Sequence, residues 1–178
     1  MHLKPLDLLV CLELATGEGR STTYSELGRA VGLSASEANQ AALRAVRAGL
    51  LQAPQSRAEK PRPNARALLE FLEHGVRFAF FAVPGKIVRG MPTAHSAPPL
   101  RGMVDAGGEP PLVWPDAEGD ARGQAVEPLY KTVPCAARSN PRLYELLALT
   151  DALRCGSARE RRLAMQELEL RILGAADR

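Results

Sequence analysis

Apolar residues recur at helical spacing near the start of the chain. Leu6, Leu9, Val10 and Leu14 form one stripe with a period of about 3.6 residues, which predicts an amphipathic helix. Gly17 follows three residues after Leu14, and a glycine shortly after the last periodic residue is a common helix stop. The chain is therefore expected to open with a single helix.

Two further helical segments follow, and each begins with a capping box. In this arrangement a hydroxyl side chain and a carboxylate three residues later satisfy backbone amides that the helix start leaves unpaired. The boxes are Thr23 with Glu26 and Ser34 with Glu37, ahead of helices expected over residues 24–31 and 35–48. Only Gly32 and Leu33 separate the two helices, and so short a turn between capped helices is typical of a helix-turn-helix.

The segment after these helices is short, polar and basic. Residues 52–63 contain few apolar positions and suit a β-hairpin wing, and Asn64 then caps another helix that ends at His74 and Gly75. Residues 1–75 are thus predicted to form a winged helix-turn-helix.

The middle of the chain, residues 76–139, is rich in proline and glycine and leaves room only for short apolar runs. Val76, Phe78 and Phe80 alternate with their neighbours and predict a strand, and a second strand is expected within residues 85–93. This segment is predicted to be small, loop-rich and β.

Helical periodicity returns in residues 140–178. Asn140 can cap a helix whose first position is Pro141, and Gly156 with Ser157 opens another helix, so a helical hairpin is expected. The whole chain is predicted to be α+β, with three parts: residues 1–75, 76–139 and 140–178.

The helix over residues 35–48 has an outer face that suits DNA recognition. Small alanines on its inner face let it lie close to the two preceding helices, and polar side chains point outward. The predicted base readers are Ser36, Asn39, Gln40 and Arg44. The predicted phosphate contacts, in this helix and in the wing, are Arg47, Arg57, Lys60 and Arg62.

The run Tyr24-Ser25-Glu26-Leu27-Gly28-Arg29-Ala30-Val31-Gly32-Leu33-Ser34, closed by Arg47-Ala48-Gly49-Leu50-Leu51, resembles the winged helix of MarR-like bacterial regulators. The resemblance covers about residues 3–63 and implies duplex DNA as the ligand. MarR-like proteins flank this domain with long dimerisation helices, whereas here a proline-rich segment follows. In that order of parts the chain is similar to antitoxin-type regulators of phage-defence and toxin–antitoxin operons.

Composition and motifs bear on whether the chain is a nucleic-acid-binding, membrane, secreted or enzymatic protein. The net charge of +3 is too small to indicate a nucleic-acid partner by itself, although residues 44–66 are strongly basic. No apolar run reaches the ~18 residues of a membrane span and no secretory signal opens the sequence, so a cytoplasmic protein with reduced cysteines is expected. The histidines and cysteines are scattered and no phosphate loop, metal motif or nucleophile motif is present, so no cofactor and no enzymatic activity are expected.

The sequence therefore predicts a DNA-binding transcriptional regulator, in the form of an autoregulating repressor. It is expected to be a homodimer, with the C-terminal hairpin as the first choice of interface, because helix-turn-helix proteins usually read two half-sites. One alternative is an antitoxin or adaptor whose C-terminal half binds a protein partner. A further alternative is an RNA-binding winged helix.

Overall fold

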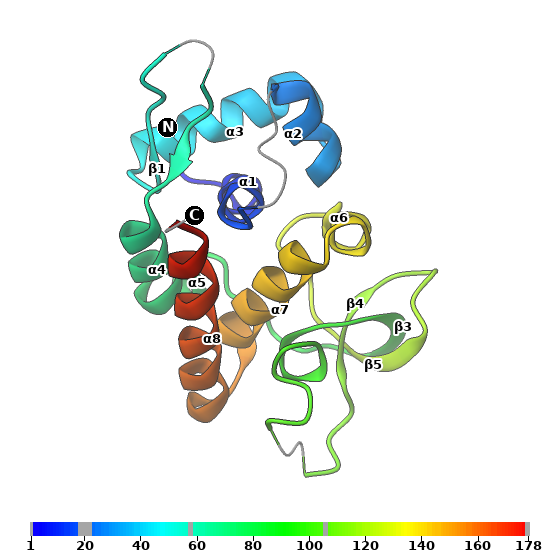
Figure 1. The fold of residues 1–178 in the computed structure, drawn as a ribbon. Helices are drawn as coiled ribbons and strands as arrows, with labels where there is room; N and C mark the ends of the chain where they lie inside the picture. The colour runs from blue at the N-terminus through cyan, green and yellow to red at the C-terminus, as the bar shows by residue number, and fades with distance from the viewer. Residues whose placement is uncertain (1, 18–22, 57–58, 105–106, 177–178) are drawn as a thin grey trace.

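The computed structural model describes residues 2–17, 23–56, 59–104 and 107–176. The fold is mixed α and β, as predicted, with helices in the N-terminal and C-terminal parts and a small sheet between them in the chain (Figure 1).

The N-terminal part begins with three helices: α1 (Pro5–Ala15), α2 (Tyr24–Val31) and α3 (Ala35–Arg47). Both predicted capping boxes are present. The Glu26 amide donates to Thr23 Oγ1 over 3.2 Å, and the Glu37 amide donates to Ser34 Oγ over the same distance. The starts of α2 and α3 are thus determined locally by the sequence.

Two glycines make the turn between α2 and α3 tight. Gly32 has a φ of 71°, a left-handed conformation that costs other residues energy. At Gly28, an added Cβ would lie 2.6 Å from the Leu33 carbonyl oxygen, so only glycine lets α3 start this close to α2.

The β-hairpin that the sequence analysis interprets as a wing is present, and so is the helix after it. β1 (Leu51–Gln52) pairs antiparallel with β2 (Arg62–Pro63). α4 (Ala65–His74) follows, and Asn64 Oδ1 accepts from the Ala67 amide at its start.

The strand predicted to begin at Val76 is wrong. The chain instead forms a one-turn helix, α5 (Val76–Ala79), and then runs extended without pairing in a described sheet. Val76 is buried while Phe78 and Phe81 are exposed, so the apolar residues do not share one sheet face. A short apolar run does not distinguish the 3.6-residue period of a helix from the two-residue period of a strand, and the wrong prediction arises from this ambiguity.

The second predicted strand is present as β3 (Ile87–Pro92), which is followed by the short 3₁₀ helix η1 (Ala94–Ser96). β3 pairs antiparallel with both β4 (Leu112–Pro115) and β5 (Ala121–Ala125). β4 and β5 pair in parallel, so the three strands close into a small barrel.

Three helices complete the chain: α6 (Val133–Ser139), α7 (Pro141–Cys155) and α8 (Ala158–Ala176). α6 lies in the segment predicted to be β, and the sequence did not predict this helix. Its seven residues are too few to show a helical period. The α7–α8 hairpin is confirmed, including its cap, since Asn140 Oδ1 accepts from the amides of Arg142 and Leu143.

α7 lies at the centre of the molecule, between the N-terminal helices and the sheet (Figure 1). Residues Leu146 to Arg154 are all buried, so this helix has no solvent-facing side over most of its length. One continuous hydrophobic core joins residues from all three predicted parts of the chain.

A buried polar cluster fastens the sheet to α7. Asp151 Oδ2 accepts from Thr93 Oγ1 over 2.8 Å and from Trp114 Nε1 over 2.5 Å. Its other oxygen binds the guanidinium of Arg154, which also donates to the Phe80 carbonyl. Trp114, the one tryptophan of the chain, is fully buried.

None of the described helices is both long enough and apolar enough to cross a bilayer.

Candidate nucleic-acid interface

α3 has sharply different inner and outer faces. Its inner face consists of small, fully buried side chains, which are Ala38, Ala41, Ala42 and Ala45. Its outer face carries a stripe of exposed residues at helical spacing, which are Ser36, Gln40, Leu43 and Arg47. Because residues at i, i+4, i+7 and i+11 lie one above another, these four side chains can meet a single ligand surface.

The other two predicted base readers lie on the flanks of this stripe. Asn39 is half-buried on one flank. Arg44, on the opposite flank, turns toward α1 and binds the fully buried Asp7, with Nε 2.9 Å from Oδ2 and an NH2 group 2.6 Å from Oδ1. Only 13% of the Arg44 side chain is exposed, so its guanidinium is engaged inside the fold and fastens α3 to α1.

Hydrogen bonding to Asp7 raises the pKa of Arg44 above its ordinary value. An arginine side chain is charged at neutral pH with or without this partner. The raised pKa therefore reflects the strength of the bidentate pair with Asp7 and not a change in charge. Asp7 also accepts from the Lys4 amide over 2.9 Å. The same carboxylate thereby caps α1 and anchors α3.

The wing, which follows α3 in the chain, carries two basic groups in its described part. Arg62 is exposed on β2. Lys60 is half-buried, with Nζ 4.5 Å from the centroid of the Tyr24 ring, so a cation–π contact ties the wing to the start of α2. The predicted contact Arg57 lies outside the described residues.

Sequence reasoning missed two residues of this surface. Leu43 is 43% exposed in the middle of the outer stripe, and its helical spacing from Gln40 and Arg47 was the signal that could have placed it. Lys131 precedes α6 and is exposed, and its charge acts on Glu37 in the first turn of α3. No local pattern indicates this second proximity, because 94 residues of chain separate the pair.

The described residues contain no group of three His, Cys, Asp or Glu side chains that could hold a metal ion. His95 Nδ1 lies 2.8 Å from Glu160 Oε1, which joins η1 to the start of α8.

All three cysteines are free thiols, as predicted. Burial raises the pKa of the Cys11 thiol well above its ordinary range and that of Cys155 to about 12. These two thiols are therefore poor nucleophiles, since the thiolate is the reactive form.

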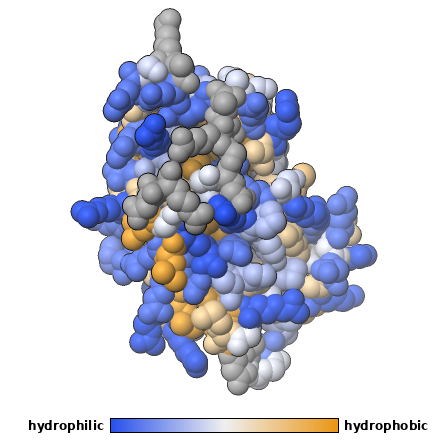
Figure 2. Space-filling model, in the orientation of Figure 1, coloured by the Kyte–Doolittle hydropathy of each residue, from blue (hydrophilic) through white to orange (hydrophobic). Residues whose placement is uncertain are grey.

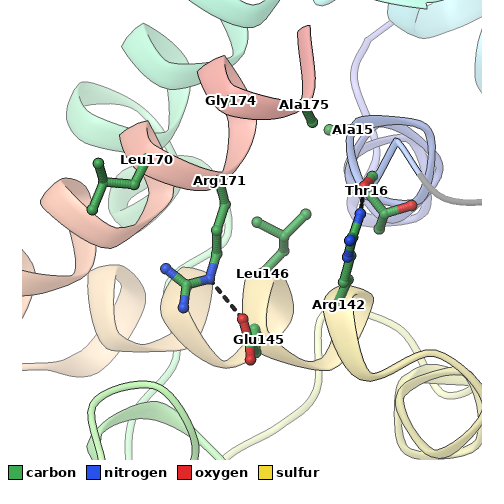
Figure 3. A pocket seen from close by; sticks show the side chains of 9 residues that line it. All are labelled: Ala15, Thr16, Arg142, Glu145, Leu146, Leu170, Arg171, Gly174 and Ala175. Atoms are coloured by element: carbon green, nitrogen blue, oxygen red, sulfur yellow. Dashed lines mark hydrogen bonds and ion pairs between the residues drawn. The ribbon is translucent and has the colours of Figure 1, made fainter. Parts of the chain in front are cut away.

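A pocket of about 260 Å³ lies where the ends of α1 and α8 meet α7 (Figure 3). Two arginines line it, but both are engaged. Arg171 binds Glu145 over 2.7 Å and also Glu167, and Arg142 donates to the Thr16 carbonyl over 3.3 Å. Since Arg171 is neutralised by two carboxylates, the pocket does not favour a small anion.

Apart from Leu43 on α3 and Met103, the large apolar side chains exposed on the described surface lie in two places. Figure 2 shows one of them over α8, where Leu170 is 69% exposed and Leu173 42%. The other lies between α5 and β3. We call this the apolar strip, and its members are Phe78, Phe81, Val83 and Ile87.

A scan against protein families, a search of curated proteins and a search of solved structures all find no match to this chain.

Proposed function

We propose that residues 1–75 form a winged helix-turn-helix and that the protein is a sequence-specific, duplex-DNA-binding transcriptional regulator that represses its own operon. The observation that carries the proposal is the outer stripe of α3. It presents hydrogen-bonding side chains on a helix that is held by a face of alanines, and a short basic hairpin follows it in the chain. A helix of this kind fits the major groove, which is about 12 Å wide.

The contacts divide into two classes. Ser36 and Gln40 can form hydrogen bonds with base edges, and Leu43 can pack on a thymine methyl group. Arg47, Lys60 and Arg62 suit phosphates, whose binding determines affinity and its salt dependence rather than the choice of sequence. Arg44 is left out of the proposed contacts because Asp7 holds its guanidinium.

The test of base reading compares a duplex from the region upstream of the gene with a scrambled duplex of equal length. Wild-type protein is expected to prefer the upstream duplex. Gln40→Ala is expected to lower affinity for it roughly tenfold or more, with little effect on the scrambled duplex, because a base contact contributes about 1–3 kcal/mol of discrimination. Gln166→Ala, on the exposed face of α8, is the matched control.

Fluorescence anisotropy between about 50 mM and 200 mM salt measures these affinities. The proposal is wrong if wild-type protein binds neither duplex at the low end of this range. Tighter binding to single-stranded or folded RNA than to either duplex would favour an RNA-binding winged helix instead.

A protein partner for the second half of the chain is the second candidate function, as in an antitoxin or adaptor. The apolar strip favours it, because three of its four side chains are more than 70% exposed. For the regulator proposed above, the occupant is a second copy of this chain, whereas an antitoxin or adaptor would bind a different protein there. Phe78 and Phe81 alone expose roughly 300 Å² of apolar surface, a fitting centre for an interface of about 800 Å² per partner.

A further inference from the structure

The turn between α2 and α3 is covered by a segment from the second half of the chain. Thr132 Oγ1 donates to the Val31 carbonyl over 2.7 Å, across 101 residues of sequence. At Gly32, an added Cβ would lie 2.8 Å from Thr132 Cβ, so the Thr132 side chain packs directly on the backbone of this turn. Thr132 is therefore fixed against the turn that precedes the candidate recognition helix.

This contact places Lys131 beside the first turn of α3. Hydrogen bonds from the Ser34 hydroxyl and amide to the Glu37 carboxylate are the main reason that the pKa of Glu37 lies below its usual value. The positive charge of Lys131 lowers this pKa further, in agreement with its place next to Thr132, which is bonded to the turn before α3.

Lys131 and the wing lie at opposite ends of α3. The wing follows the last turn of this helix, while the segment before α6 meets its first turn (Figure 1). α3 has 13 residues and is about 20 Å long, so cations at its two ends lie far enough apart to flank a major groove about 12 Å wide.

We propose that residues 130–132 belong to the DNA-binding surface and that Lys131 binds a backbone phosphate at the start of α3, across the groove from the wing. An ammonium group on a flexible stem binds phosphate as a point charge, without reading the base sequence. This inference rests on the proposed function. It adds that the second half of the chain contributes directly to DNA affinity.

The experiment measures the salt dependence of duplex binding by the full chain. Each phosphate contact contributes about 0.9 to the slope of log K against log salt. Lys131→Gln is expected to lower the slope by this amount and to weaken binding about eightfold at 0.1 M salt, which is what a slope of 0.9 gives relative to 1 M. The loss is expected to be equal for upstream and scrambled duplexes, and Lys131→Arg is expected to keep the wild-type slope.

The matched control is Lys86→Gln, which removes an exposed lysine just before β3 and is expected to leave the slope unchanged. If Lys131→Gln also keeps the wild-type slope while the wild type binds DNA, this inference fails and the proposed function stands. If the wild type binds no duplex, both fail. Circular dichroism checks that the variants fold.

Discussion

At the scale of single residues, Arg44 shows how the fold can use a side chain that a sequence pattern assigns to a ligand. On a helical projection, residue 44 lies beside the exposed stripe, where it can turn either to DNA or to α1. The buried Asp7 carboxylate decides between them, because a charge removed from water needs a partner. Arg44 therefore holds α3 in place, and its guanidinium does not face a ligand.

Arg44→Ala is expected to destabilise the fold by about 3–5 kcal/mol, since it leaves a buried carboxylate without its ionic partner. Urea unfolding, followed by the fluorescence of Trp114, measures the loss. Arg29→Ala, exposed on the neighbouring helix α2, serves as the control and is expected to change stability by no more than about 0.5 kcal/mol. Equal stability of the two variants would show that the pair with Asp7 contributes little.

At the scale of elements, the sheet and α7 are joined through Asp151. This carboxylate accepts hydrogen bonds from Thr93 at the end of β3 and Trp114 on β4, and it binds Arg154 one helical turn further along α7. The small barrel has only three short strands, so its position depends on this cluster and on the apolar side chains around it.

Asp151→Ala is expected to cost about 3–5 kcal/mol, because it leaves the buried Arg154 charge and two neutral donors without their acceptor. Denaturant unfolding measures this loss, and amide hydrogen exchange in β3 and β4 is expected to become faster. Glu169→Ala, on the exposed face of α8, is the control. Unchanged exchange in these strands would show that apolar packing alone holds the sheet on α7.

At the scale of the whole molecule, the exposed apolar side chains favour self-association. A second copy on the apolar strip would bring two α3 helices into one particle, as the two half-sites of a typical operator require. Phe78→Ser with Phe81→Ser is expected to convert a dimer into a monomer in analytical ultracentrifugation. Leu170→Ser, on the exposed surface of α8, is the control and is expected to leave the dimer intact.

The opposite pattern, with dissociation caused by Leu170→Ser alone, would identify the C-terminal hairpin as the interface, as the sequence suggested. A wild-type monomer at micromolar concentration would contradict the dimer on either surface. Because both surfaces are already exposed in the single chain, neither set of substitutions is expected to disturb the core.

Much of the secondary structure followed from the sequence alone, because its signals are local. The two capping boxes, the glycine at the end of α2, and Asn140 with Pro141 at the start of α7 act over a few residues, and the elements begin and end there as expected. The inner and outer faces of α3 followed from helical periodicity in the same way. α5 and α6 were missed because they are too short to show a period.

Tertiary structure alone decided which charged groups face solvent and which segments meet. Asp7 lies 37 residues from Arg44, Asp151 lies 58 from Thr93, and Thr132 lies 101 from Val31. Such contacts depend on how the helices pack around the buried α7, and no pattern within one helix or strand contains that information. The sequence by itself therefore determined the candidate recognition helix, whereas the packing of the chain removed Arg44 from its surface and brought Lys131 to its edge.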